Sequence, residues 1–273
     1  MAISTSSIFH FTPTLDILKL ILQDGFKITY CLEEFNLGTG RSELGISMIS
    51  FSDIPISNLV SIGSSYGSFG IGLSKDWASK NRINPVVYME SNSNFSQIVC
   101  DFIEIIQDKT DLQAQYEINP LGNTTHEIKK LDSHENNNLY NLMLGLLSNI
   151  KNSNGDLLRK DKDPISNFNF YAEREWRFVP SESEFEDCHL SYEPVLTKEA
   201  FLEWRTQSSQ KDFFPCLNLT FESTDISHIL VEKESDIKEV INILKEIPKL
   251  NDKDKFEILL TKITSFERLK LDY

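Results

Sequence analysis

Two glutamates stand two residues apart in Glu173-Arg174-Glu175, within a stretch of strand character. Residues two apart on a strand face the same side, so both carboxylates would reach one site. A fixed carboxylate can stabilise positive charge that develops on a substrate, and it can accept a proton from a nucleophile. The same side chains, together with Arg177, could instead form a solvated ladder of salt bridges. The spacing leaves a catalytic and a structural interpretation open.

Polar and aromatic side chains near the N-terminus could complete such a site. His10 lies on a short apolar strand, where a core histidine with satisfied hydrogen bonds is the more common outcome. Tyr66 and Phe69 could stack on a ring-shaped ligand, although core packing is the usual fate of aromatic residues. Ser50 and Ser52 could order the site. The nearby glycines are not a dinucleotide fingerprint, because no strand–GxGxxG–helix unit surrounds them.

Length and composition favour a globular cytoplasmic protein. The 273 residues are 40% hydrophobic, which is enough for an ordinary core. No apolar run approaches the roughly 20 residues of a membrane span, and the first residues lack the features of a signal peptide. The four cysteines are far apart, which predicts free thiols in a reducing compartment. Histidines are equally scattered, so we expect no metal site.

The charge balance is acidic. Lysine and arginine total 27 against 41 aspartates and glutamates, for a net charge of −14. An acidic surface repels phosphate backbones, so we expect no constitutive nucleic-acid binding. The acidity could serve solubility alone, or it could complement a basic partner protein.

Helix and strand signals alternate at both ends of the chain. Thr14 is a candidate N-cap for a helix over Leu15–Gln23, and Gly25 provides its stop. A short helical turn is expected over Lys75–Lys80 and a helix over Asp236–Leu244. Strands are expected at Ile8–Phe11, Ile46–Phe51, Ile71–Leu73, Val86–Met89, Phe168–Val179, Leu217–Phe221 and Ile226–Val231.

The middle of the chain has a different character. Helices are expected over Ile98–Gln107 and Leu139–Ile150. Asp108–Asn138 has few large apolar residues and is expected as a peripheral loop or excursion. Lys151–Asp163 is expected as a charged linker. The pattern predicts an α+β fold in one domain, residues 1–273, with mixed or antiparallel sheets, flanking helices and a helical or loop insertion at about 92–163.

Several phrases of the sequence occur together and in order: Phe9–Thr12, Ile49–Pro55, Tyr66–Trp77, Ile83–Tyr88, Tyr171–Arg177 and Leu260–Ile263. They resemble the AbiGi-like family of bacterial abortive phage-resistance proteins, over both ends of the chain and mainly not in its middle. The resemblance implies a role in anti-phage defence, and the family carries an antitoxin label.

A looser resemblance is to the ADP-ribosyltransferase fold, including the DarT-type DNA ADP-ribosyltransferases, in which a strand bearing His-x-Thr precedes a helix and a glycine. This resemblance implies NAD as a substrate, with Glu175 as the catalytic carboxylate assisted by Glu173 and His10. Cleavage of the nicotinamide–ribose bond passes through an oxocarbenium-like state that a carboxylate would stabilise. The implied NAD-binding residues are His10, Thr12, Ser50, Ser52, Tyr66, Gly67 and Phe69.

Two functions follow from these resemblances. In the first, the chain is an NAD-dependent ADP-ribosyltransferase-like effector or toxin that modifies a phage or host macromolecule. In the second, it is a catalytically silent, antitoxin-like binding protein that neutralises a partner toxin.

Overall fold

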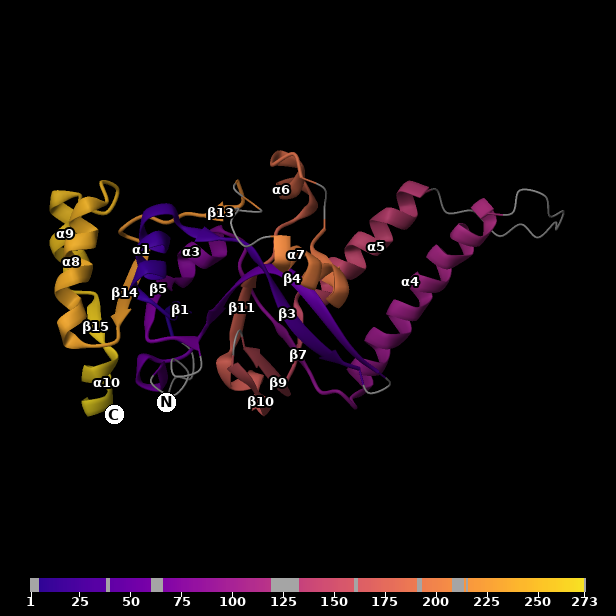
Figure 1. The fold of residues 1–273 in the computed structure, drawn as a ribbon, viewed down its shortest axis with the longest axis horizontal. Coiled ribbons are helices and arrows are strands. Elements are labelled where there is room, and N and C mark those ends of the chain that lie inside the picture. Colours follow the sequence, from indigo (N-terminus) through magenta and orange to yellow (C-terminus); the bar gives the residue numbers. More distant parts are fainter. Residues whose placement is uncertain are drawn as a thin grey trace.

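The computed structural model describes residues 5–37, 40–59, 66–118, 133–159, 162–190, 193–207, 214 and 216–272. Strands and helices are mixed along the chain, and most strands join one large sheet (Figure 1). The predicted α+β class is confirmed. Within the described part of the chain, no helix is long and apolar enough to cross a membrane.

The large sheet has nine strands, with the path β15-β14-β5-β1-β4-β11-β6. Neighbours on this path run antiparallel, apart from the parallel pair β14–β15. The path strands are β1 (Ser7–Thr12), β4 (Arg41–Ser52), β5 (Phe69–Ser74), β6 (Asn84–Pro85), β11 (Glu175–Phe178), β14 (Ile226–Val231) and β15 (Ile263–Ser265).

The long strand β4 belongs to two parts of the sheet. Its first part pairs with β3 (Thr29–Asn36) and with β12 (Val195–Thr197). Its last four residues pair with β11, and Ser52 also pairs with Phe9 of β1. β4 therefore brings β1, β3 and β11 close together, although β11 follows the other two by more than a hundred residues along the chain.

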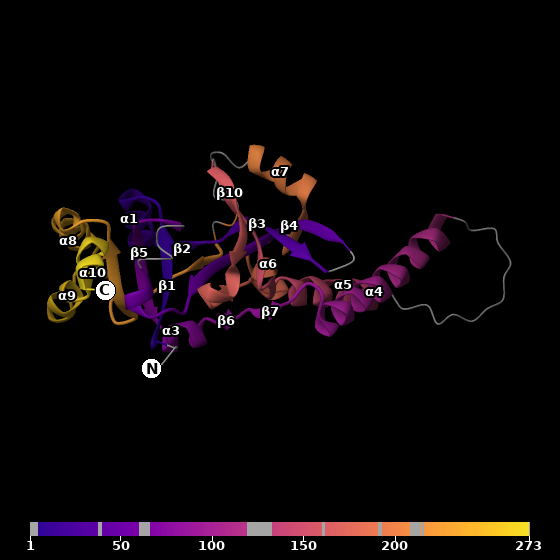
Figure 2. The same ribbon diagram turned by 90° about the horizontal axis from the view of Figure 1, so that it is seen from below.

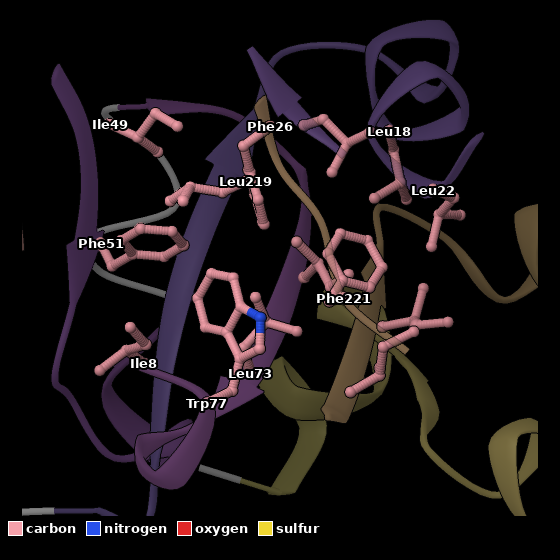
Figure 3. Packing of buried hydrophobic residues seen from close by; sticks show 14 of the residues in the cluster. Ile8, Leu18, Leu22, Phe26, Ile49, Phe51, Leu73, Trp77, Leu219 and Phe221 are labelled. Carbon is pink, nitrogen blue, oxygen red and sulfur yellow. The ribbon is translucent and has the colours of Figure 1, made fainter. Parts of the chain in front are cut away.

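Helices cover the end of the sheet that holds β1, β5 and β14. They are α1 (Leu15–Asp24), α3 (Lys75–Lys80), α8 (Ile237–Glu246), α9 (Lys253–Leu260) and α10 (Phe266–Asp272). Thr14 caps α1 as predicted, and Gly25 ends it at φ +87°, a conformation that suits glycine. Phe26, Phe51, Trp77 and Phe221 pack together between sheet and helices (Figure 3).

Two helices, α4 (Asn94–Ile118) and α5 (Ser133–Leu147), project away from the sheet (Figures 1 and 2). The predicted loop over Asp108–Asn138 is wrong at both ends, because α4 continues to Ile118 and α5 already begins at Ser133. Propagating a helix that has already formed costs little, even where its sequence is polar. Residues 119–132 of this prediction lie outside the described residues.

The predicted linker over Lys151–Asp163 is also wrong. β8 (Ile150–Asn152) runs parallel to β7 (Val87–Met89), and β9 (Asn154–Arg159) forms a hairpin with β10 (Lys162–Asn169). Burial of Ile150 and Leu157 stabilises these strands despite the surrounding charges. Further along, β13 (Asn218–Leu219), which pairs with β2 (Phe26–Lys27), is shorter than the strand predicted there.

The expectation of four free thiols is wrong for one pair. Cys188, which follows α6 (Glu182–Asp187), is disulfide-bonded to Cys216 with a Cα–Cα distance of 5.8 Å. The two segments already meet through Phe185 and Phe214, whose ring centroids lie 5.6 Å apart. Distance along the chain was therefore a poor guide to pairing.

Candidate functional site

A cavity of about 730 Å³ lies beside the segment of β4 that joins β1, β3 and β11. Tyr30, Phe201 and Trp204 form an aromatic part of its wall, the last two from α7 (Lys198–Gln207). Six of the residues singled out from the sequence also line it: His10, Ser50, Ser52, Tyr66, Glu173 and Glu175. Among the described residues, no group of histidine, cysteine or carboxylate side chains is placed to hold a metal ion.

Glu175 is buried on β11 and engaged by two cations. Its carboxylate accepts a hydrogen bond from Lys151 Nζ at 2.6 Å and another from Arg177 Nε at 2.6 Å. Its backbone N–H donates to the Tyr88 hydroxyl oxygen at 2.7 Å. Burial by itself would raise the pKa of this carboxyl, but Arg177 and Lys151 outweigh burial and lower the pKa to about 2. Glu175 is therefore ionised and paired.

Glu173 does not lie on the strand. It ends the short 3-10 helix η2 (Phe170–Glu173), and Arg174 follows in a left-handed conformation at φ 49°. The prediction that both glutamates share one strand face is therefore wrong, since the chain turns between them. Both carboxylates nevertheless approach Lys151 Nζ, that of Glu173 at 3.8 Å.

The pKa of the Glu173 carboxyl lies close to neutral pH. It accepts a hydrogen bond from the Tyr66 hydroxyl. Burial raises its pKa to about 7, although Lys151 and the bond from Tyr66 act in the opposite direction. Burial and the neighbouring Glu173 raise the pKa of Tyr66, so the phenol keeps its proton.

Glu33 completes an ion network of five side chains: Glu33, Lys151, Glu173, Glu175 and Arg177. Arg177 is fully buried and binds both Glu33 and the Ser148 carbonyl oxygen, the latter at 2.9 Å. Burial would lower the pKa of Lys151, but the carboxylates of Glu175 and Glu33 outweigh it, so the amine stays charged. Lys151 and Arg177 are the two cations of the network, and Glu33 and Glu175 are the carboxylates that pair with both of them.

His10 lies at the junction of β1 and β4. Its Nδ1 is 2.8 Å from the Ser50 carbonyl oxygen, which can only accept, so Nδ1 carries the proton and Nε2 is the acceptor. Burial lowers the pKa of the ring, which is therefore neutral at pH 7. The strand pleat directs His10 toward Phe26 and Phe51, away from Glu175, with ring centroids at 5.2 and 5.7 Å. The cavity nevertheless contacts both His10 and Glu175, next to Phe9 and Ser52, the residue pair that joins β1 to β4.

The remaining predicted NAD-binding residues do not line the cavity. The Thr12 hydroxyl donates to the Thr14 carbonyl oxygen at 3.0 Å, next to the start of α1. A Cβ atom on Gly67 would lie 2.0 Å from the Thr12 carbonyl oxygen, so this glycine permits close backbone packing. Phe69 is buried in the main core.

Sequence reasoning missed several residues of this site. Lys151 was hidden within the expected linker, and Glu33 had no motif that would distinguish it. Cys31 also lines the cavity, but burial and Glu33 raise the pKa of its thiol to about 12, so it is no nucleophile at neutral pH.

Comparisons with known proteins agree on one family. The family model described as a proposed abortive phage resistance protein AbiGi, antitoxin, matches residues 24–232. A protein from Lactococcus lactis subsp. cremoris, named abortive phage resistance protein AbiGi, is 26% identical over 253 residues, which cover 86% of this chain and 92% of that protein. No solved structure gives a significant match, so no structural neighbour supports the ADP-ribosyltransferase-like part of the fold prediction.

Proposed function

Because the chain belongs to the AbiGi family of abortive phage resistance proteins, we propose that it is the antitoxin-type member of an anti-phage defence system. In this role it binds a partner toxin and restrains it. The antitoxin label belongs to the family description, and the matching region includes the cavity-lining strands β3, β4 and β11.

The observation that carries this proposal is the pairing of Glu175. A carboxylate that stabilises a ribose cation must direct its charge at the substrate. The carboxylate of Glu175 is instead hydrogen-bonded to two cations of the protein itself, Lys151 and Arg177, which offset its negative charge. The geometry suits a carboxylate that joins β11 to β8 and, through Arg177 and Glu33, to β3. We assign Glu175 a structural role in a binding protein.

The net charge of −14 fits the same role. An acidic surface attracts a basic partner and speeds its association, and it repels nucleic acid and other acidic proteins. A toxin that acts on nucleic acid or on other phosphate-bearing substrates would carry the complementary charge.

Expression of the chain by itself tests the proposal. An antitoxin leaves growth unchanged when it is produced alone, because it acts only on its partner. We expect an induced culture to grow at the rate of a culture that expresses an inactive protein of similar size. Growth arrest by the chain alone would contradict the proposal and favour an effector.

The second candidate is the NAD-dependent ADP-ribosyltransferase-like effector, with a phage or host macromolecule as acceptor. The observation in its favour is that one cavity holds His10, Tyr66, Glu173 and Glu175. Tyr66 or Trp204 could stack on nicotinamide. The fit to the pyrophosphate of NAD is poor, because four glutamates outnumber the two cations of the cavity wall, Lys151 and Arg205, and Lys151 is already paired with carboxylates. We therefore derive no reaction step through NAD.

Nicotinamide release from NAD tests this candidate directly. The effector reading requires activity in the wild type that Glu175→Gln lowers by roughly a hundredfold or more. The antitoxin proposal requires that wild type and variant release nicotinamide at the same background rate.

A further inference from the structure

The first half of α4 carries large apolar side chains that the described part of the protein leaves exposed. Phe95, Ile98 and Ile105 are 40%, 62% and 55% exposed. Their spacing of three and seven residues places them along one side of the helix. Val99 and Ile106 point into the core that anchors the hairpin to β3 and β4, and each lies about 100° around the helix from its neighbour Ile98 or Ile105. The exposed apolar residues of α4 therefore border its anchoring face, with Phe95 at the boundary.

α5 repeats this arrangement. Leu142 and Leu146, four residues apart, are 68% and 45% exposed, whereas Met143 and Leu147 are buried in the same core as α4. Both helices extend outward from the sheet in two perpendicular views, and their inner ends pack against it (Figures 1 and 2). Each of the two helices therefore presents exposed apolar side chains at helical spacing, a pattern typical of a protein-binding site.

Charge identifies the kind of partner. Residues 94–106 include Asp101 and Glu104, both exposed, and no lysine or arginine. Across α4 as a whole there are five acidic residues and a single lysine, and α5 has one glutamate and neither lysine nor arginine. A second copy of this chain would bring the same acidic surface and be repelled. A partner with lysine or arginine beside its apolar contacts would be attracted.

We infer that the α4–α5 hairpin is a docking surface for an amphipathic helix of a basic partner protein. The exposed apolar residues are Phe95, Ile98, Ile105, Leu142 and Leu146, and we name them the hairpin stripe. A helix with an apolar seam packs well against stripes of helical spacing, and basic residues beside its seam would meet Asp101 and Glu104. This inference rests on the proposed function, since the basic partner would be the toxin.

A synthetic peptide tests the chemistry of the surface. The probe is an amphipathic helix of about three heptads with a leucine seam and lysine and arginine beside it. A matched peptide has glutamate at the basic positions. Fluorescence anisotropy with the full chain should show binding of the basic peptide, and binding of the acidic peptide should be at least roughly tenfold weaker. Equal binding of both peptides, or of neither, would overturn the inference.

A double variant tests the location. Ile98→Asp with Ile105→Asp should weaken binding of the basic peptide by roughly tenfold or more, because both side chains lie in the stripe. Leu271→Asp is the matched control, because Leu271 is 84% exposed on α10, outside the hairpin. The control should bind as the wild type does, and both proteins should keep the wild-type circular dichroism. Equal loss of binding in the control would overturn the inference.

Two further measurements separate the surface from the proposed function. Cells that express the toxin should be rescued by wild type and not by the double variant. Rescue by both would reject this surface and leave the antitoxin role intact, whereas rescue by neither would reject the antitoxin role itself. Sedimentation should show a monomer; a dimer that the double variant dissociates would mean that a second copy covers the stripe, contrary to this inference.

Discussion

Lys151 places its ammonium nitrogen 2.6 Å from a carboxylate oxygen of Glu175 and so joins two separate sheets. Lys151 lies on β8, which pairs with β7, whereas Glu175 lies on β11 of the nine-stranded sheet. The same nitrogen is 3.2 Å from Glu33 on β3. Four segments, β3, β8, η2 and β11, therefore meet at one buried ion network, and β3 lies more than a hundred residues before the other three. The members of the network depend on one another for charge balance.

Replacement of Glu175 tests this dependence. Glu175→Gln keeps the shape of the side chain and leaves Lys151 and Arg177 with too little negative charge around them. Loss of one partner from a buried ion pair destabilises a protein by about 3–5 kcal/mol. We expect a loss of about 3 kcal/mol in the free energy of unfolding, measured by urea denaturation at neutral pH.

Glu246→Gln on α8 is the control for this substitution, because Glu246 is exposed. Its free energy of unfolding should stay within about 0.5 kcal/mol of wild type. If the two variants had equal free energies of unfolding, the ion network would not contribute to stability.

The raised pKa of Glu173 predicts that the stability of the protein depends on pH. Its pKa rises from 4.5 to about 7 on folding, so the folded chain binds more protons than the unfolded chain between these values. The stabilisation is therefore fully present below about pH 4.5 and is lost as the pH rises through 7. Glu173→Gln mimics the protonated form and keeps an acceptor for Tyr66. Relative to wild type, the variant should gain about 2 kcal/mol between pH 5 and 8.

Urea denaturation of both proteins at several pH values in this range measures the effect. Parallel stability curves for wild type and Glu173→Gln would show that Glu173 does not titrate there.

The sequence predicted those elements whose signals are local. Thr14 and Gly25 mark the two ends of α1, and the predicted boundaries of α3 and of β14 agree with the structure. β8 and the position of Lys151 could not be predicted, because both depend on partners distant in the chain. Ile150 pairs with Val87, and the charge of Lys151 is buried only because three carboxylates surround it.

For the same reason, the candidate site could be predicted only in part. The sequence singled out Glu173, Glu175, Tyr66 and His10, and all four line one cavity. It did not show that Glu175 is neutralised, because Lys151 comes from a segment without a motif. A pair of carboxylates in a sequence cannot reveal which cations reach it in the fold.

Gly67 offers a test of backbone packing next to the cavity. It has φ +154°, and a Cβ atom would lie 2.0 Å from the Thr12 carbonyl oxygen. Gly67→Ala should therefore lower the free energy of unfolding by about 2 kcal/mol or more. At the exposed Gly40 a Cβ atom would meet nothing within 4 Å, so Gly40→Ala should be nearly neutral. Thermal melting distinguishes the two, and equal melting temperatures would contradict the packing seen at Gly67.

The Cys188–Cys216 bond closes a loop that contains α7, and with it Phe201 and Trp204 of the cavity wall. A disulfide across 28 residues typically contributes about 3 kcal/mol by restricting the unfolded chain. Cys188→Ser with Cys216→Ser should lose about this amount in urea denaturation. A reductant should lower wild-type stability to the level of the double variant and leave the variant unchanged. An effect of similar size on both proteins would mean that the reductant acts elsewhere.

The central claim is that the chain restrains a toxin and does no damage of its own. The most direct measurement is the growth rate of cells in which the partner toxin is induced, with and without this chain expressed from a second plasmid. Co-expression of the chain is predicted to restore growth to near the rate of uninduced cells, and Glu173→Gln should restore it equally. Continued arrest in the presence of well-folded wild-type protein would contradict the account.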